Sequence, residues 1–424
     1  MKLVLSNVRP NGGEAVDIEI TDGKISQITK ANSLKADIDG RGFIALPGLV
    51  DLHTHLREPG REDSETVATG SLAAARGGFT AVHAMANTTP VADNAGVVEQ
   101  IYRLGQESGN CDVYPVGAVT QGLGGTALSE LGAMADSAAR VRVFSDDGKC
   151  VHDPVLMRRA LEYVKAFDGC IAQHAQEPLL TEDAQMNEGE VSSVLGLRGW
   201  PKVAEEAIIA RDVLLAEHVG ARLHVCHLST AGSVEIIRWA KSRGISVTAE
   251  VTPHHLLLTD ETARTYDPVY KVNPPLRTQA DVEALRTALA DGTIDIVATD
   301  HAPHPSEDKE CEWSAAAFGM VGLETALPII NTVMVQSGLM TWDDVARVMS
   351  QTPAAIGRVE NHGNEISVGC DANITLCDPD FKADVDRENS ASKSRNNPFH
   401  GMELFGRTGV TLLRGKITYK AEWI

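Results

Sequence analysis

The sequence predicts a (β/α)8 barrel with a small β-sandwich domain formed by both chain ends. In the middle of the chain, apolar β-branched runs alternate with Ala-, Glu- and Arg-rich stretches of helical period, as repeated βα units do in a parallel sheet. Eight such runs are present, and eight parallel strands that each precede a helix make this barrel. Both chain ends instead show short alternating runs and turn signals without a helical pattern, which indicates β-structure.

The domain boundaries follow from this change in texture. We expect a discontinuous β-sandwich domain of residues 1–46 plus 362–424, and a barrel domain of residues 47–361. A chain of 424 residues has room for a barrel of about 250 residues and a smaller unit.

The eight expected barrel strands share an apolar, β-branched composition. They are Phe43 to Leu52, Phe79 to Met85, Asp112 to Val119, Arg140 to Phe144, Gly169 to Gln173, Arg222 to Cys226, Ser246 to Val251 and Ile294 to Ala298. Active sites of such barrels lie at the C-terminal ends of the strands. Here those ends carry polar residues rich in His and Asp, namely His53, His55, Asn87, Thr120, Asp146, Asp147, His174, His227, Thr252, His254 and Asp300.

Composition and charge exclude several functional classes. The chain is 43% hydrophobic and 23% charged, as ordinary globular proteins are. Its formal net charge of -20 repels polyanions, so we expect no nucleic-acid partner and no anionic membrane partner. No apolar stretch approaches the roughly 20 residues of a bilayer span, and the N-terminus lacks the apolar core of a signal peptide, which predicts a cytoplasmic protein. The seven cysteines show no C-x-x-C spacing, and we interpret them as mostly buried free thiols.

The strand-end histidines and aspartates form a candidate metal site. His53 and His55 lie two apart on the first strand and so point to the same face, where both imidazoles can reach one metal ion. His174 and His227 each close a further strand, and Asp300 closes the eighth. A carboxylate at a barrel mouth is desolvated unless it meets a cation or a strong donor, and a metal ion is the simplest partner.

A further carboxylate follows the fourth strand in Asp146-Asp147-Gly148. One of the two aspartates would bridge a pair of metal ions and offset their mutual repulsion. The alternative interpretation is a βα turn with an Asp cap. The ring as a whole predicts two metal ions that activate a shared hydroxide.

Two stretches resemble the signatures of the dihydroorotase family within the amidohydrolase superfamily. The first is Pro47-Gly-Leu-Val-Asp-Leu-His-Thr-His-Leu-Arg57-Glu-Pro59, and the second is Ala298-Thr-Asp-His-Ala-Pro-His304 running on to Lys309. The resemblance extends over nearly the whole chain through four further stretches, Met85 to Pro90, Phe144 to Gly148, Tyr270 to Arg277 and Phe318 to Glu324.

This resemblance implies two zinc ions as cofactors. His53, His55 and Asp300 would hold the first, His174 and His227 the second, and Asp147 would bridge them. Asp147 is chosen over Asp146 because the family's bridging aspartate precedes its next histidine ligand by the interval from Asp147 to His174. Related hydantoinases use a carboxylated lysine instead, whereas Lys149 here lies past the strand end and is interpreted as a loop residue. Whether one or both zinc sites are occupied stays open.

The resemblance also implies a substrate and the residues that contact it. The reaction would be the reversible hydrolysis of L-dihydroorotate to N-carbamoyl-L-aspartate, with Asp300 as the catalytic group that moves protons. Substrate contacts would come from His55, Arg57, Asn87, Asn273, His304, Phe318 and Gly319, with Arg57 and Asn87 on the substrate carboxylate. The planar fork of an arginine independently suits a carboxylate.

Three alternatives remain open from the residues alone. One is another cyclic amidase, allantoinase or hydantoinase, with the same metal ring. Another is a non-catalytic relative that serves as a structural partner of aspartate carbamoyltransferase, and the third is a purely structural zinc site. We expect a small-molecule substrate and a homodimer, and an association with aspartate carbamoyltransferase stays open.

Overall fold

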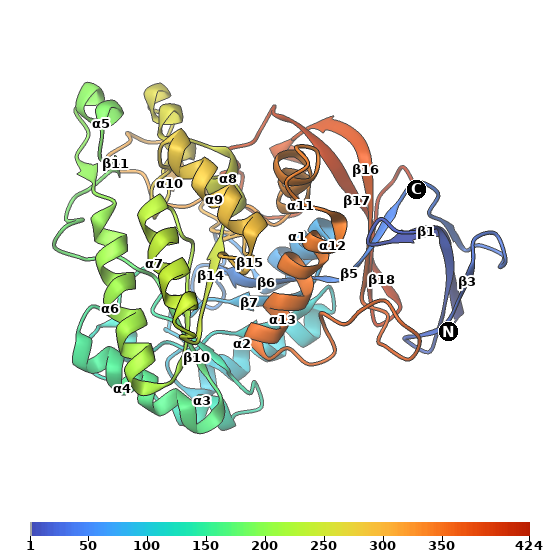
Figure 1. Ribbon diagram of the computed structural model, residues 1–424, viewed down its shortest axis with the longest axis horizontal. Coiled ribbons are helices and arrows are strands. Elements are labelled where there is room, and N and C mark those ends of the chain that lie inside the picture. The colour runs from blue at the N-terminus through green and yellow to red at the C-terminus, as the bar shows by residue number, and fades with distance from the viewer. Residues whose placement is uncertain (1) are drawn as a thin grey trace.

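The chain folds into a closed barrel and an outer sheet that lies against one side of it (Figure 1). The computed structural model describes residues 2–424. Helices surround the barrel, and both chain ends lie at the outer sheet (Figure 1). None of the helices in this range is long and apolar enough to cross a membrane.

Eight parallel strands form the barrel, one from each predicted run. They are β6 (Leu49–Thr54), β7 (Phe79–Ala84), β8 (Asp112–Pro115), β9 (Val143–Phe144), β10 (Cys170–Gln173), β13 (Arg222–Val225), β14 (Val247–Val251) and β15 (Ile296–Val297). Pairing joins β6–β7–β8 and β9–β10–β13–β14–β15. Parallel bridges Gly117–Phe144 and Thr54–His301 connect both edges of these two sheets, so the ring closes and the predicted barrel is confirmed.

The first predicted run is divided between the two parts of the fold. Residues Ile44–Pro47 form β5, which pairs antiparallel with β16 (Ile374–Asp384) in the outer sheet, and only β6 enters the barrel. Gly48 separates the two strands, and a Cβ there would lie 2.3 Å from Oγ1 of Thr80. The apolar run looked continuous because both strands are buried.

The helices begin and end at sequence signals that fix their positions. For example, Thr66 and Thr69 form a capping box at the start of the first helix, and Gly78 ends it with a φ of 96°. The helices are α1 (Val67–Gly77), α2 (Ala95–Ser108), α3 (Leu131–Asp136), α4 (Pro154–Val164), α5 (Glu190–Leu195), α6 (Val203–Val219), α7 (Ala231–Ser242), α8 (Pro253–Leu257), α9 (Gln279–Asp291), α10 (Ser306–Lys309), α11 (Ala326–Ile330), α12 (Trp342–Ala346) and α13 (Thr352–Gly357). Two short strands that the sequence did not predict, β11 (Met186–Asn187) and β12 (Gly199–Trp200), pair in the segment between β10 and α6.

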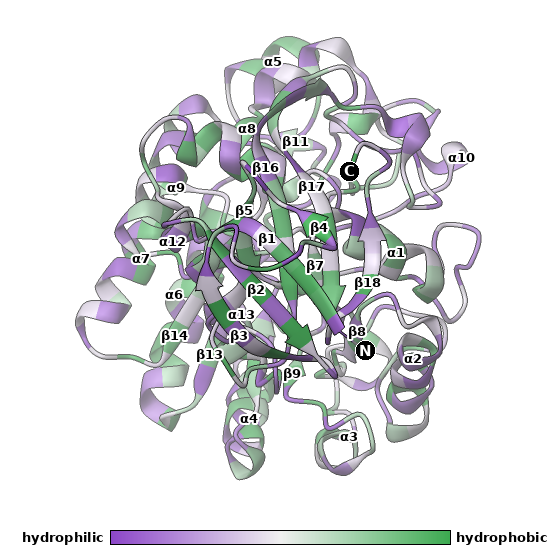
Figure 2. Cartoon of the chain, turned by 90° about the vertical axis from the view of Figure 1, so that its right-hand side faces the viewer, coloured by the Kyte–Doolittle hydropathy of each residue, from purple (hydrophilic) through white to green (hydrophobic). Residues whose placement is uncertain are grey.

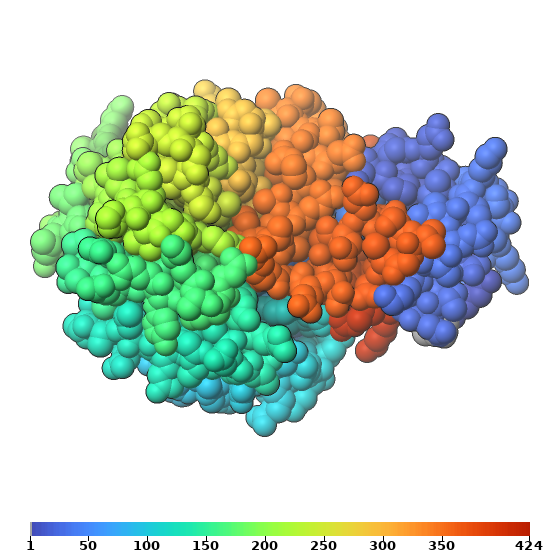
Figure 3. All heavy atoms as spheres, turned by 60° about the horizontal axis from the view of Figure 1, so that its bottom comes forward, coloured from blue at the N-terminus to red at the C-terminus, as the bar shows by residue number. Residues whose placement is uncertain are grey.

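The outer sheet combines strands from both ends of the chain. Its order is β18-β17-β16-β5-β1-β2-β3, with β4 paired to β1. Besides β5 and β16 it contains β1 (Lys2–Pro10), β2 (Val16–Thr21), β3 (Lys24–Lys30), β4 (Ile38–Asp39), β17 (Glu403–Leu413) and β18 (Lys416–Lys420). Green apolar stretches are visible along its strands in Figure 2, and Figure 3 shows the N-terminal segment as a separate lobe beside the barrel.

One apolar cluster holds the two halves of the outer sheet together. It joins Leu5 and Ile18 of the N-terminal strands to Ile374 and Val410 of the C-terminal strands. The main barrel core is a separate, larger cluster. All seven cysteines are free thiols, and five of them are buried.

Candidate metal centre

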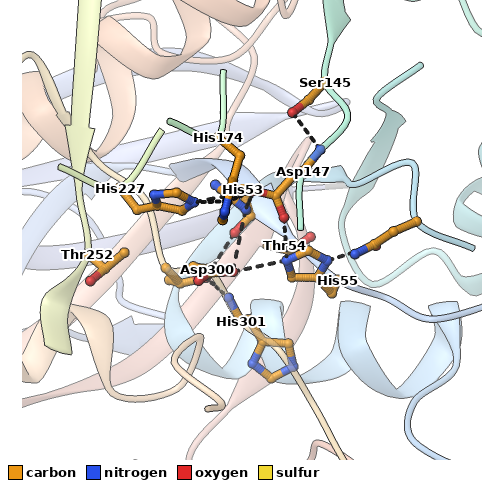
Figure 4. A network of polar contacts seen from close by, with 12 residues as sticks. His53, Thr54, His55, Ser145, Asp147, His174, His227, Thr252, Asp300 and His301 are labelled. Atoms are coloured by element: carbon orange, nitrogen blue, oxygen red, sulfur yellow. Dashed lines mark hydrogen bonds and ion pairs between the residues drawn. The ribbon is translucent and has the colours of Figure 1, made fainter. Parts of the chain in front are cut away.

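The six predicted metal ligands meet at the C-terminal ends of the barrel strands. His53 and His55 extend from β6, and the other four follow β9, β10, β13 and β15, as Asp147, His174, His227 and Asp300 respectively. All six are buried. Figure 4 shows their side chains pointing toward one another.

Asp147 lies at the centre of this group. Its Oδ1 atom is 3.3 Å from Nε2 of His53, 3.2 Å from Nδ1 of His174 and 3.3 Å from Nε2 of His227. Its Oδ2 atom is 3.3 Å from Nε2 of His55. The carboxylate therefore belongs to two sets of close donor atoms, one with His53, His55 and Asp300, and one with His174 and His227.

Asp300 is the second carboxylate of the set that contains His53 and His55. Its Oδ1 atom is 3.0 Å from Nε2 of His55 and 3.4 Å from Nε2 of His53. The backbone at Asp300 has a φ of 46°, and that of His227 has a φ of 31°. Left-handed backbone is strained at residues other than glycine and concentrates at functional sites.

Asp146 has a different environment from its neighbour. It accepts hydrogen bonds from the backbone N–H of Val119 (2.8 Å) and of Thr120 (2.9 Å), and from the Thr120 hydroxyl. Its carboxylate is thus engaged in holding the β8 loop, as an Asp in a βα turn does. Lys149 is exposed and joins none of the metal-capable groups found in residues 2–424.

The charges of the site depend on one another. Burial acts to raise the pKa of Asp147, but the attraction of His53 and its contacts with His174 and His227 hold that pKa well below the ordinary value. For Asp300, burial is likewise outweighed by His53 and His55, which lower its pKa to about 2. Both carboxylates are therefore ionised at neutral pH.

The donor atoms fit a metal ion. Nε2 of His53 is buried and makes no hydrogen bond within residues 2–424. Nδ1 of His174 and Nε2 of His227 face each other at 2.9 Å. Imidazole nitrogens and carboxylate oxygens are the donors that catalytic zinc sites use, and the atoms of each set lie within 4.8 Å of one another.

Glu250 supports the ring and was missed from the sequence. Glu250 is the penultimate residue of β14, and its Oε1 atom lies 2.6 Å from Nδ1 of His53 and accepts the backbone N–H of His227 at 3.1 Å. Its Oε2 atom lies 2.9 Å from Nε2 of His224. A carboxylate that accepts a hydrogen bond from Nδ1–H leaves the lone pair of Nε2 free to bind a metal ion. It also fixes the orientation of the imidazole ring. The signal was a single acid inside an apolar strand.

We expect Glu250→Gln to weaken metal binding by about ten- to one hundredfold, because the neutral amide is a poorer acceptor for His53. Metal titration of the stripped protein measures this change. Glu235→Gln, at an exposed position on α7, serves as the matched control. Wild-type metal affinity in Glu250→Gln would show that this contact has no influence on the ligands.

The predicted substrate residues are connected to the six predicted ligands through His55 and to one another through Arg57 and His304. Nδ1 of His55 lies 2.9 Å from Oδ1 of Asn87. Nε of Arg57 donates to the Pro303 carbonyl at 3.1 Å, and its Nη2 lies 3.4 Å from Nε2 of His304. Burial lowers the pKa of Arg57 to about 10, so the guanidinium remains charged.

The segment that contains Phe318 and Gly319 packs directly against His304. Nε2 of His304 donates to the Phe318 carbonyl at 2.9 Å. Gly319 has a φ of 135°, and a Cβ there would lie 2.8 Å from the Ala302 side chain and 2.9 Å from Nε2 of His304. Only glycine fits this close approach.

Asn273 reaches the site through a residue that the sequence did not indicate. Its Nδ2 atom donates to Oε1 of Gln176 at 3.0 Å, and the same oxygen lies 2.8 Å from Nε2 of His174. Oδ1 of Asn273 is buried and has no hydrogen-bond partner in residues 2–424. A hydrogen-bond acceptor is therefore left free close to His174, one of the six predicted ligands.

The chain is similar to known proteins over nearly its whole length. Residues 42–233 match a family model described as dihydro-orotase-like. A protein of Streptomyces coelicolor named dihydroorotase is 67% identical over 98% of this chain and 98% of its own length. A dihydroorotase of Leifsonia xyli is 63% identical over 96% of this chain and 93% of its own. Among solved structures, the L-hydantoinase (dihydropyrimidinase) of Arthrobacter aurescens superposes with a TM-score of 0.87 at 27% identity, covering 99% of this chain and 96% of that one.

Proposed function

This chain belongs to the dihydroorotase family, and from that premise we propose that its ring of six histidines and aspartates performs the family's reaction with zinc. The reaction is the reversible hydrolysis of L-dihydroorotate to N-carbamoyl-L-aspartate, a step of de novo pyrimidine biosynthesis. The single observation that carries the proposal is the position of Asp147, whose two oxygens face four histidines from the ends of three strands. A non-catalytic relative would have no reason to keep this arrangement.

The proposed ligand sets follow the two groups of donor atoms. His53, His55 and Asp300 would hold one zinc ion, His174 and His227 the other, and Asp147 would be shared. Bound zinc lowers the pKa of a water molecule toward 7 and polarises a carbonyl oxygen. An all-histidine and carboxylate set without cysteine is typical of catalytic rather than structural zinc.

Asp300 is proposed to move the proton. Its carboxylate is ionised because His53 and His55 keep its pKa low. It accepts a proton from the water that attacks the ring amide carbonyl, and then delivers this proton to the amide nitrogen as the C–N bond breaks. In ring closure the same carboxylate acts in the opposite order.

Arg57 and Asn87 are proposed to bind the carboxylate of the substrate. The Arg57 guanidinium has one nitrogen engaged with the Pro303 carbonyl, which orients the rest of its planar fork. Asn273, His304 and the backbone of Phe318 and Gly319 would contact the ring. A partly buried cation beside the six predicted ligands favours an anionic substrate such as dihydroorotate over an uncharged hydantoin.

We expect Arg57→Met to lower kcat/KM for dihydroorotate by about two orders of magnitude, because a charge-assisted contact to the substrate carboxylate is lost. Steady-state kinetics measure this loss. Turnover of dihydrouracil, which lacks the carboxylate, should change little in the same variant. Arg61→Met, half-exposed and paired with Asp63 and Asp308, is the matched control. An equal loss on both substrates would contradict the assignment.

One experiment tests the proposed function as a whole. Purified protein is assayed with dihydroorotate, allantoin and a hydantoin while its bound zinc is measured. We expect selective turnover of dihydroorotate and a zinc content of one to two ions. Preferential turnover of either rival substrate would overturn the proposal.

We further propose that the protein acts in the cytoplasm as a homodimer. Mass measurement in solution tests the dimer, and a single-chain mass would contradict it. An association with aspartate carbamoyltransferase is tested by mixing the two purified proteins and looking for co-elution.

A further inference from the structure

Two buried lysines lie beneath residues 313–319, the segment that carries Phe318 and Gly319. Lys271 is 2% exposed and Lys309 is 6% exposed. Lysine is among the residues that are rarely buried without a charged partner. Neither ammonium group forms an ion pair with a carboxylate anywhere in residues 2–424. These two side chains have no part in the reaction as described so far.

Lys271 binds the first half of the segment. Its Nζ atom donates to the carbonyl oxygens of Trp313 at 2.7 Å, Ser314 at 3.3 Å and Ala316 at 2.7 Å. The same Nζ atom lies 4.4 Å from the centre of the Phe318 ring, a cation–π distance. The ammonium therefore contacts both the backbone and the side chain of the segment.

Lys309 binds the second half. Its Nζ atom donates to the carbonyl oxygens of Lys271 at 3.1 Å, Ala317 at 2.8 Å and Gly319 at 3.0 Å. The N–H of Gly319 in turn donates to the Lys271 carbonyl at 2.9 Å. Nδ2 of Asn396 adds a second donor to the Gly319 carbonyl at 3.2 Å.

Together the two ammonium groups gather six carbonyl oxygens around themselves. Burial lowers the pKa of Lys309 to about 7, with a further contribution from Lys271, and lowers the pKa of Lys271 to about 8. Burying two cations without counter-ions opposes folding. Apolar side chains would fill the same space at less cost, so the role of the two lysines lies in the segment that they hold.

We propose that Lys271 and Lys309 are positioning residues for substrate binding. They hold residues 313–319 in the shape that presents the Phe318 and Gly319 backbone to the ring of the substrate. This rests on the proposed function of that backbone. Because the lysines bind these carbonyl oxygens, the bend at Gly319 stays packed against Ala302 and His304. The two lysines act on substrate binding, since neither contacts any of the six predicted metal ligands within residues 2–424.

The test replaces each lysine by methionine, which keeps the length of the side chain and removes every donor. For Lys309→Met we expect the KM for dihydroorotate to rise about ten- to one hundredfold, as the loss of charge-assisted hydrogen bonds predicts, with kcat within about threefold of wild type. Bound zinc should stay unchanged. Lys382→Met, an exposed lysine on β16 paired with Glu403, is the matched control.

A second measurement is independent of catalysis. Amide hydrogen exchange of the peptide that spans residues 313–319 should become faster in Lys309→Met and Lys271→Met and stay unchanged in Lys382→Met. If Lys309→Met fails to fold, KM and amide exchange in Lys271→Met test the inference in its place. Unchanged exchange in this peptide, or a fall in kcat at constant KM, would overturn the inference.

The two proposals fail in distinguishable ways. Wild-type protein that does not act on dihydroorotate would defeat the proposed function, while faster exchange in the lysine variants would still support the clamp on residues 313–319. Wild-type protein that turns over dihydroorotate, with lysine variants that keep KM and exchange, would defeat only the inference.

Discussion

Asp300→Asn is expected to lower kcat by about three orders of magnitude or more in both directions of the reaction. The amide has nearly the same shape as the carboxylate but cannot accept a proton from the attacking water. In wild-type protein the contacts with His53 and His55 keep the carboxylate ionised, so it is ready as a base at neutral pH. Initial rates with dihydroorotate and with carbamoyl aspartate measure the effect.

Zinc analysis of the same preparation separates proton transfer from metal binding. If Asp300→Asn keeps its zinc and loses its turnover, the proton role is supported. Asp136→Asn, at the exposed end of α3, should behave as wild type. Near-normal activity in Asp300→Asn would refute the assignment of this residue.

The second large effect is expected for Asp147→Asn. This change removes the negative charge of the carboxylate that faces the four histidines, and we expect most of the bound zinc to be lost and turnover to fall by about one hundredfold or more. Metal content after dialysis and kcat are the measurements. The reason is the shared position of Asp147 between the two donor sets.

Asp146→Asn is the matched comparison for this variant. Its carboxylate accepts three hydrogen bonds from Val119 and Thr120, so we expect a loss of about 1–3 kcal/mol in the free energy of unfolding, with zinc retained. Thermal unfolding measures it. The reverse pattern, zinc lost from Asp146→Asn and kept by Asp147→Asn, would exchange the roles of the two residues.

The barrel and the meeting of the six side chains at its rim could be predicted because both obey local rules. A strand of period two puts His53 and His55 on one face, and parallel strands bring His174, His227 and Asp300 to the same rim. No long-range information is needed once the eight runs are recognised. The first run was the exception, because burial of both β5 and β6 hides the division at Gly48.

The supporting contacts could not be predicted because they join segments that are distant in sequence. Glu250 is 197 residues from His53, and Gln176 is 97 residues from Asn273. Lys309 ends the second signature, and nothing in the neighbouring sequence indicates that its side chain binds the carbonyl oxygens of a loop. Such pairs depend on the loops' final paths, which local pattern does not specify.

The single glycine between β5 and β6 has a practical consequence for anyone who would shorten this protein. Its N–H donates to the Asn373 carbonyl, its own carbonyl accepts from Ser350, and the neighbouring Thr80 leaves no space for a side chain. The outer sheet formed by the two ends of the chain is thus continuous with the strand that carries His53 and His55. A shortened chain without its two ends would lose the support of the strand that carries these two proposed ligands, so engineering should keep the whole polypeptide.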